Sequence, residues 1–275
     1  MTPARCRVIV TTYERPAHLR RALAAWRRQT CLDFALTVAD DGSGPETAAI
    51  VKAFAATAPF EVRHSWWEHR DYRRSGVLNK AVRESGAEPL LLFTDGDCVP
   101  PADHLARHLA VHGSRTLQSA GAYSIPQAAT EALTVADVEA GRHEALPTAA
   151  DRRAMRARAR RTRRKTLLRR SRHPRLVGLN VGVDRALFEE VNGYDEAFVG
   201  WGHEDEDLRD RIMRTRPRPR VRLLWGVADT LHLWHPASPD RGAGRNTDYF
   251  HSGRPVRCLA GLVDERDRAV LGPLI

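Results

Sequence analysis

Hydrophobic positions in the first hundred residues follow two different periods, which predict alternating strands and helices. Runs rich in aliphatic and β-branched residues at 6–12, 34–39, 61–67 and 90–93 are typical of strands, and the last is the continuous apolar run expected of a buried central strand. Leu19, Leu23 and Trp26 recur at helical spacing after Pro16, and stretches at 46–57 and 77–84 also predict helices. This alternation implies right-handed crossovers and a mostly parallel sheet of the α/β class.

The second half of the chain has a less regular pattern. A helix is predicted over 132–146, strands over 175–183 and 221–225, and a turn over 193–196. A further helix starts near His203 and ends at about Arg214, because prolines follow at 217 and 219. Three histidines recur at i, i+4 and i+8, a spacing that favours a polar face on the surface of a helix over a metal site: His104, His108 and His112.

Acidic residues follow two of the predicted strands. Asp40 and Asp41 come after the second strand, and Asp95, Gly96 and Asp97 come after the fourth. Ligands of open α/β sheets bind at the carboxyl ends of the strands, so these residues indicate an enzyme with one shared crevice. Residues i and i+2 of an extended segment point to the same side, which lets Asp95 and Asp97 face one Mg²⁺ or Mn²⁺ ion beside phosphate oxygens. The alternative is a pair of solvated surface carboxylates.

Two histidines near the end of the chain add a second kind of metal ligand. His232 and His235 stand three residues apart, directly before a proline, and follow a predicted strand. Together with Asp97 they would form a mixed nitrogen and oxygen site, which suits manganese better than an all-oxygen site does. The alternative is that one or both imidazoles are structural.

A dense acidic cluster at 203–207 begins the helix predicted near His203. Negative charge at this end is favoured by the helix dipole, which also lowers carboxylate pKa values and would keep Glu204 or Asp205 ionised as a general base. Trp201 and Gly202 just before it offer an aromatic platform with an open approach, which suits stacking on a sugar.

The charge of the chain is strongly uneven. Its 275 residues include 44 basic and 34 acidic ones, but 13 of the basic ones and no acidic ones lie between Arg152 and Arg175. This basic run (residues 152–175) is either a solvated helix or loop, or a surface for anionic substrates or lipid headgroups. It contains few aromatic residues, so no specific nucleic acid is expected. Four scattered cysteines and the lack of a long apolar window predict a cytoplasmic protein. If the basic run binds lipid headgroups, the protein would also make peripheral contact with the inner face of the membrane.

The motifs, taken together, resemble those of family 2 inverting glycosyltransferases with the GT-A fold, and more narrowly a subgroup with a galactosyltransferase-like C-terminal region. The similarity extends over about residues 6–240. Seven segments match in order: VIVTTYERP (8–16), ADDGS (39–43), NKA (79–81), DGDC (95–98), NGYDE (192–196), GWGHED (200–205) and HLWHP (232–236).

This resemblance implies a role for each matching residue. Asp205 would be the catalytic base, and Glu204 would bind a sugar hydroxyl. Asp97 would bind the metal, helped by His232, His235 or both. The donor, a UDP-sugar, would be bound by the remaining matching residues: Thr11, Glu14 and Asp40 or Asp41 at the uridine, Arg73 at the diphosphate, Asp95 and Gly96 near the ribose, Asn79, and Trp201 and Gly202 at the sugar.

The resemblance also implies the fold and the reaction. We expect a Rossmann-like GT-A domain of two fused halves, a nucleotide-sugar half (1–115) and an acceptor and catalytic-base half (116–250), followed by a C-terminal tail (251–275). The expected reaction is metal-dependent transfer of a sugar, with inversion, to a hydroxyl of a glycan, a glycolipid or another bacterial glycoconjugate. Two alternatives remain at this point: a nucleotidyltransferase, or a nucleic-acid or anionic-lipid binding protein with an inactive core.

Overall fold

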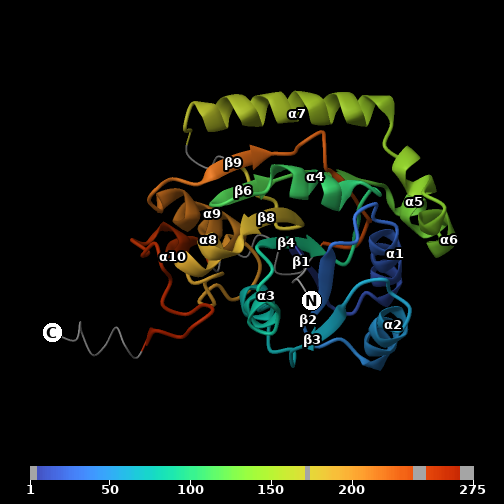
Figure 1. Ribbon diagram of the computed structural model, residues 1–275, viewed down its shortest axis with the longest axis horizontal. Coiled ribbons are helices and arrows are strands. Elements are labelled where there is room, and N and C mark those ends of the chain that lie inside the picture. The colour runs from blue at the N-terminus through green and yellow to red at the C-terminus, as the bar shows by residue number, and fades with distance from the viewer. Residues whose placement is uncertain (1–4, 171–173, 238–245, 267–275) are drawn as a thin grey trace.

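The computed structural model describes residues 5–170, 174–237 and 246–266 and centres on a seven-stranded sheet (Figure 1). The strand order is β3-β2-β1-β4-β8-β6-β9. The bounds are β1 (Cys6–Thr12), β2 (Phe34–Asp40), β3 (Val62–Trp66), β4 (Leu90–Asp95), β6 (Thr116–Ser119), β8 (Asn180–Asp184) and β9 (Arg220–Leu223).

The sheet is mostly parallel, as predicted. Only β8 runs against its neighbours β4 and β6, whereas the other pairs in the sheet are parallel. The register places Thr11 beside Asp95, and Thr12 beside Asp40. The acidic ends of β2 and β4 therefore lie on either side of β1, at one edge of the sheet.

Helices cover both faces of the sheet, because neighbouring strand residues point to opposite sides. Val8 and Val10 pack with α1 (Pro16–Arg27), α2 (Pro45–Ala55) and α4 (His104–Val111). Ile9 and Phe93 pack on the other face with α3 (Arg74–Arg83), α8 (Arg185–Glu190) and α9 (Glu204–Arg214). The sheet includes strands from both predicted halves, so one core joins them.

A second, smaller sheet has the order β5-β10-β7, formed by β5 (Cys98–Val99), β10 (Thr230–His232) and β7 (Ala122–Ser124). In its antiparallel pair, His232 lies opposite Cys98. This pairing brings residues that are far apart in the sequence to the end of β4.

Two expectations for the second half were wrong in their boundaries. Residues 127–145 form three short helices rather than one: α5 (Gln127–Ala132), α6 (Val135–Glu139) and the 3-10 helix η1 (Arg142–Ala145). The strand predicted from residue 175 begins only at Asn180, because the preceding segment turns at Gly178 and packs against Asp205. The last described helix is α10 (Thr247–His251).

Most of the basic run is a helix, α7 (Ala149–Leu167), and residues 171–173 of the run lie outside the described residues. Thr148 and Asp151 form a capping box at its start, each side chain bonding the other residue's backbone N–H. Met155 and Thr162 are its buried residues, and the helix lies along the outside of the molecule near β9 (Figure 1). Among the described helices, none is long and apolar enough to cross a bilayer.

The histidine stripe is not on the surface as expected. His104 and His108 are fully buried, because α4 packs its histidine face onto the sheet and α1. His104 meets the ring of Trp26 edge-on, and His108 Nδ1 bonds Gln118 Oε1 at 2.6 Å. Burial lowers the pKa of both imidazoles and so favours their neutral forms.

Candidate active site

Three side chains at the end of β4 form a cluster that can hold a metal ion. The ligand atoms of Asp97, His232 and His235 all lie within 4.8 Å of one another. His235 Nε2 is 3.2 Å from Asp97 Oδ2, and His232 Nε2 is 3.6 Å from Oδ1. The β5–β10 pairing and a hydrogen bond from Leu233 N to the Asp97 carbonyl (2.9 Å) hold the three together.

The charges around Asp97 keep it ionised. Its carboxylate is buried, which by itself raises its pKa, but the hydrogen bond from His235 and the charges of His232 and Arg15 lower the pKa to about 2. Arg15 donates to Asp97 Oδ2 at 2.9 Å. A carboxylate with two imidazoles fits a divalent cation of the manganese type, and the remaining coordination positions would fall to a bound ligand or water.

Gly96 stands where two backbones approach closely. Its N–H donates to the Thr11 carbonyl at 2.7 Å, and a Cβ at this position would lie 3.0 Å from the same oxygen. Thr11 Oγ1 in turn donates to Asp95 Oδ1 at 2.6 Å. Asp95 therefore lies directly beside the end of β1, two residues from Asp97.

Arg74 connects Asp95 with the predicted base and was not singled out from the sequence. Its buried guanidinium donates to Asp95 Oδ1 (3.0 Å), Asp205 Oδ1 (3.2 Å) and the Gly178 carbonyl (3.1 Å). It stands in the first turn of α3, next to Arg73, which is the exposed N-cap residue of that helix. The paired arginines are the only sequence signal, and burial decides which one enters the site.

Asp205 and Glu204 form the first turn of α9, and burial rather than the helix dipole sets their protonation. Burial raises the pKa of Asp205, and Arg74 offsets part of this. Burial and the neighbouring Asp205 charge raise the pKa of Glu204 to about 7. The expectation that the dipole lowers these pKa values was therefore wrong, because removal from water outweighs it here.

The hydrogen bonds to Asp205 are one-sided. Arg74 and the Tyr194 hydroxyl (3.3 Å) both donate to Oδ1. The carboxylate as a whole packs against Gly178, where a Cβ would lie 2.1 Å from Oδ2 and 2.6 Å from Oδ1. Among the described residues no donor is bonded to Oδ2, so that oxygen can accept a proton.

The loop before α9 leaves open space beside these carboxylates. Gly202 has φ +107°, and no atom lies within 4 Å of the position a Cβ would take. The Trp201 side chain is 41% exposed. Asn246 Nδ2 donates to the Gly202 carbonyl at 2.9 Å, while Gly202 N donates to Glu204 Oε2 at 3.0 Å. These bonds fix the backbone that follows Trp201.

The residues predicted at the uridine differ in what they can offer. Asp40 Oδ1 accepts from Ser43 N and Oδ2 bonds His64, so its carboxylate is used within the fold. Glu14 Oε1 accepts from Gly44 N at 2.8 Å. Asp41 is buried, its Oδ1 has no hydrogen-bond partner among the described residues, and burial raises its pKa to about 6. Asp41 is therefore the member of this group with a buried, unused acceptor.

Asn79 lies elsewhere than the resemblance implied. It is fully buried, its Nδ2 donates to the Tyr194 carbonyl (2.8 Å) and Glu196 Oε1 (3.0 Å), and its Oδ1 accepts from Tyr194 N (3.0 Å). A donor ligand has no polar atom of Asn79 left to bind. The side chain instead fixes the turn at 193–196, which carries Tyr194 to Asp205.

Family models match most of the chain. The model for glycosyl transferase family 2 matches residues 7–188, and that for the N-terminal domain of galactosyltransferase matches residues 160–222. The chain belongs to glycosyl transferase family 2, as the sequence motifs indicated. This favours a glycosyltransferase over the two alternatives that the sequence left open.

Curated relatives include validoxylamine A glucosyltransferases from Streptomyces hygroscopicus subsp. jinggangensis (strain 5008) and subsp. limoneus. Each is 28% identical over 258 residues, covering 84% of this chain and 57% and 53% of the relatives. The chain thus spans about half the length of the curated relatives that it matches.

Solved structures similar to this one have the GT-A fold. A mannosyltransferase of Pyrobaculum calidifontis with GDP-Man and Mn²⁺ has a TM-score of 0.56 and 19% identity, over 86% of this chain and 58% of that one. GalNAc-T7 with UDP, GalNAc and Mn²⁺ has a TM-score of 0.59 and 13% identity, over 85% and 44%. TarS of S. aureus with UDP-GlcNAc has a TM-score of 0.54 and 15% identity, over 86% and 60%. The GT-A fold predicted by the motifs is confirmed.

Proposed function

We propose that the chain is a metal-dependent, inverting glycosyltransferase that moves a sugar from a UDP-sugar to a hydroxyl of a glycan or glycolipid acceptor. One observation carries this proposal: Arg74 joins Asp95 at the end of β4 to Asp205 at the start of α9. Asp97, two residues from Asp95, belongs to the metal-type cluster. A leaving group held at β4 and a base on α9 would therefore work in the same crevice.

In the proposed reaction Asp205 is the general base. Its Oδ2 takes the proton of the acceptor hydroxyl, whose oxygen forms a bond to the anomeric carbon of the sugar. The bond from that carbon to the diphosphate oxygen breaks, and the nucleoside diphosphate leaves with the electron pair. Attack from the face opposite the leaving group inverts the configuration. The bonds from Arg74 and Tyr194 to Oδ1 fix the carboxylate so that Oδ2 meets the acceptor.

The charged groups at the strand ends would bind the donor. Asp97, His232 and His235 would hold the divalent ion, which as a Lewis acid neutralises charge on the diphosphate. Arg15 and Arg74 bring further positive charge to the same strand ends. Asp41, with its unused oxygen, is the residue we assign to a donor group of the uracil or ribose. Glu204 would accept a hydroxyl of the sugar beside the Trp201 ring.

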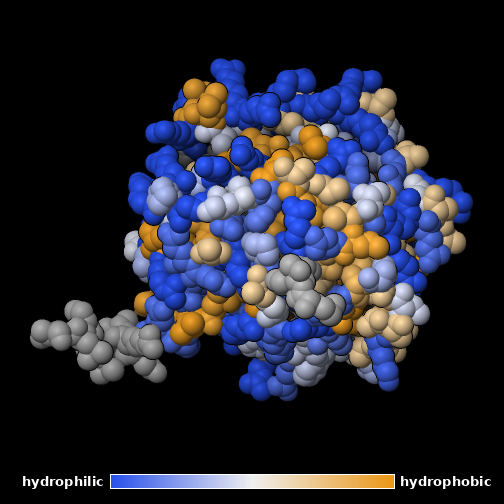
Figure 2. All heavy atoms as spheres, viewed as in Figure 1, coloured by the Kyte–Doolittle hydropathy of each residue, from blue (hydrophilic) through white to orange (hydrophobic). Residues whose placement is uncertain are grey.

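The basic run is assigned to peripheral contact with anionic lipid at the inner face of the membrane. Its exposed arginines along α7 end at Leu167 and Leu168, which are 81% and 56% exposed. Figure 2 shows a hydrophilic surface along this helix with apolar atoms at its end. Cationic side chains around exposed leucines are typical of surfaces that bind the headgroup region of a bilayer. The vesicle experiment described below tests this assignment.

The proposed reaction is tested directly by donor turnover. A panel of UDP-sugars and GDP-mannose, incubated with protein and Mn²⁺, is expected to show release of UDP from at least one UDP-sugar and its loss in EDTA. Equal turnover in EDTA would remove the metal from the mechanism. Release of GDP but never UDP would show that the nucleotide was assigned wrongly.

A further inference from the structure

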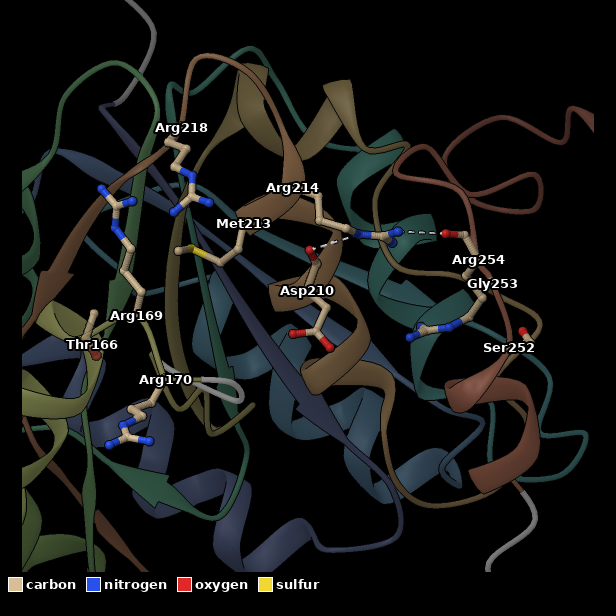
Figure 3. Close-up of a pocket in the computed structure, with 10 residues that line it drawn as sticks. All are labelled: Thr166, Arg169, Arg170, Asp210, Met213, Arg214, Arg218, Ser252, Gly253 and Arg254. Carbon is tan, nitrogen blue, oxygen red and sulfur yellow. Dashed lines mark hydrogen bonds between the residues drawn. The ribbon is translucent and has the colours of Figure 1, made fainter.

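A cavity outside the candidate active site is lined mainly by arginine. It has a volume of about 420 Å³ and lies between the C-terminal end of α7, the outer face of α9 and the segment after α10 (Figure 3). Its lining residues are Thr166, Arg169, Arg170, Asp210, Met213, Arg214, Arg218, Ser252, Gly253 and Arg254. Five cationic side chains thus surround a space with one carboxylate.

Part of this charge is already compensated within the protein. Asp210 pairs with Arg209 at 2.7 Å, and Arg254 pairs with the buried Asp207. Arg214 donates to the carbonyls of residues 254 and 255, at 2.8 and 3.3 Å. These groups shape the cavity but are already engaged.

The other three arginines have no such compensation. Among the described residues, no carboxylate lies within 4.0 Å of the guanidinium groups of Arg169, Arg170 or Arg218. Arg169, Arg170 and Arg218 all line the cavity, and in the view of Figure 3 they lie on the same side of it. Guanidinium groups bind phosphate through paired N–H donors, and a bound anion would relieve their mutual repulsion.

We propose that this cavity is a binding site for the phosphate group of a phosphorylated ligand, held by Arg169, Arg170 and Arg218. Asp210 and Arg214 follow Asp205 by five and nine residues on α9, so they point about 140° and 180° around the helix from it. The cavity therefore lies on the face of α9 away from the candidate base, and this phosphate site is separate from the candidate active site.

The phosphate can belong to a lipid headgroup or to a soluble phosphate ester. The exposed Leu167 and Leu168 stand directly before Arg169, which places apolar surface next to the cavity. A phospholipid would use both features, whereas a soluble ester would use the arginines alone.

The experiment measures binding of tripolyphosphate by calorimetry in EDTA, which keeps metal-dependent diphosphate binding out of the measurement. The variant Arg169→Gln/Arg170→Gln/Arg218→Gln is compared with Arg153→Gln/Arg156→Gln/Arg160→Gln, which removes the same charge from exposed positions on α7 away from the cavity. The cavity variant is expected to bind at least about tenfold more weakly than wild type, and the control variant to lose less than about threefold.

Equal losses in the two variants, or no binding by the wild-type protein, would overturn the proposal. Sedimentation with phosphatidylcholine vesicles containing phosphatidic acid then identifies the source of the phosphate.

On vesicles the comparison is with Arg5→Gln/Arg20→Gln/Lys52→Gln, which removes three charges from exposed positions outside both α7 and the cavity. A larger loss in the cavity variant than in this variant supports a lipid headgroup, and equal losses, with tripolyphosphate binding still cavity-dependent, support a soluble ester. A larger loss in the α7 variant than in this variant supports the lipid contact proposed for α7, and an equal loss contradicts it. Turnover of UDP-sugar by the wild-type protein is measured separately, so failure of the proposed reaction does not count against the phosphate site.

Discussion

The two oxygens of Asp205 have different surroundings, and this difference is the basis of its proposed role. Oδ1 accepts from Arg74 and Tyr194, whereas no donor among the described residues is bonded to Oδ2, and the whole carboxylate packs against Gly178. The sequence singled out Asp205 through its motif, but beyond the adjacent pair of arginines it gave no sign of Arg74, and none of the contact with Gly178. Both come from segments more than 20 residues away along the chain, so only the folded structure shows which oxygen is left to act.

Gly178→Ala tests the placement of the Asp205 carboxylate without changing a charged residue. The added methyl group would lie 2.1 Å from Oδ2, so the carboxylate must move. We expect transfer to fall about tenfold to a hundredfold, since small displacements of a catalytic group have effects of this size. Gly113→Ala is the control, because its Cβ would meet no atom within 4 Å. The rate of transfer by each variant is measured by steady-state kinetics. Equal losses of rate in Gly178→Ala and Gly113→Ala would contradict the role of Asp205 as the base.

Elements fixed by local patterns were predictable, and those fixed by long-range pairing were not. The continuous apolar strand β4 and the helix that starts at Pro16 follow from neighbouring residues. The β5–β10 pair joins short strands of two and three residues, more than 100 positions apart, and their brief runs carry no period. The metal-type cluster was nevertheless predicted, because its ligands form recognisable motifs. The surroundings of Asn79 were not, since a motif does not show which residues are buried.

Arg74 joins α3, β4 and α9, and its substitution should appear in the pH profile. Its charge lowers the pKa of Asp205, so Arg74→Gln should raise that pKa and move the acidic limb of kcat/KM to higher pH. Arg73→Gln serves as the comparison. If the exposed Arg73 binds the donor diphosphate, this variant should have a higher KM for the donor, while the acidic limb of its kcat/KM profile stays at the wild-type pH. An unmoved limb in Arg74→Gln would show that the ion pair does not tune the base.

For the molecule as a whole, the buried carboxylates of the site reduce stability at neutral pH. The pKa of Glu204 is raised by burial to about 7. Between the ordinary glutamate pKa and about 7, the folded state therefore binds more protons than the unfolded state. This contribution to the free energy of unfolding is fully present below the ordinary glutamate pKa and is lost as the pH rises through about 7.

Glu204→Gln should therefore stabilise the protein above pH 7, by on the order of 2 kcal/mol at pH 8, and have little effect near pH 4. Urea unfolding of both proteins at the two pH values measures this difference. A variant less stable than wild type at pH 8 would show that the buried charge is compensated in the native protein.

The central claim is that a divalent ion at Asp97, His232 and His235 binds the donor diphosphate while Asp205 acts on the acceptor. Calorimetric titration with UDP, in Mn²⁺ and in EDTA, separates the two roles when Asp97→Asn and Asp205→Asn are compared with wild type. The account predicts that Mn²⁺ strengthens UDP binding by wild type and by Asp205→Asn to the same extent, and that Asp97→Asn loses this gain. It also predicts that Asp205→Asn loses sugar transfer by about 10²–10⁴-fold. UDP binding that is the same with and without Mn²⁺, or unchanged in Asp97→Asn, would contradict it.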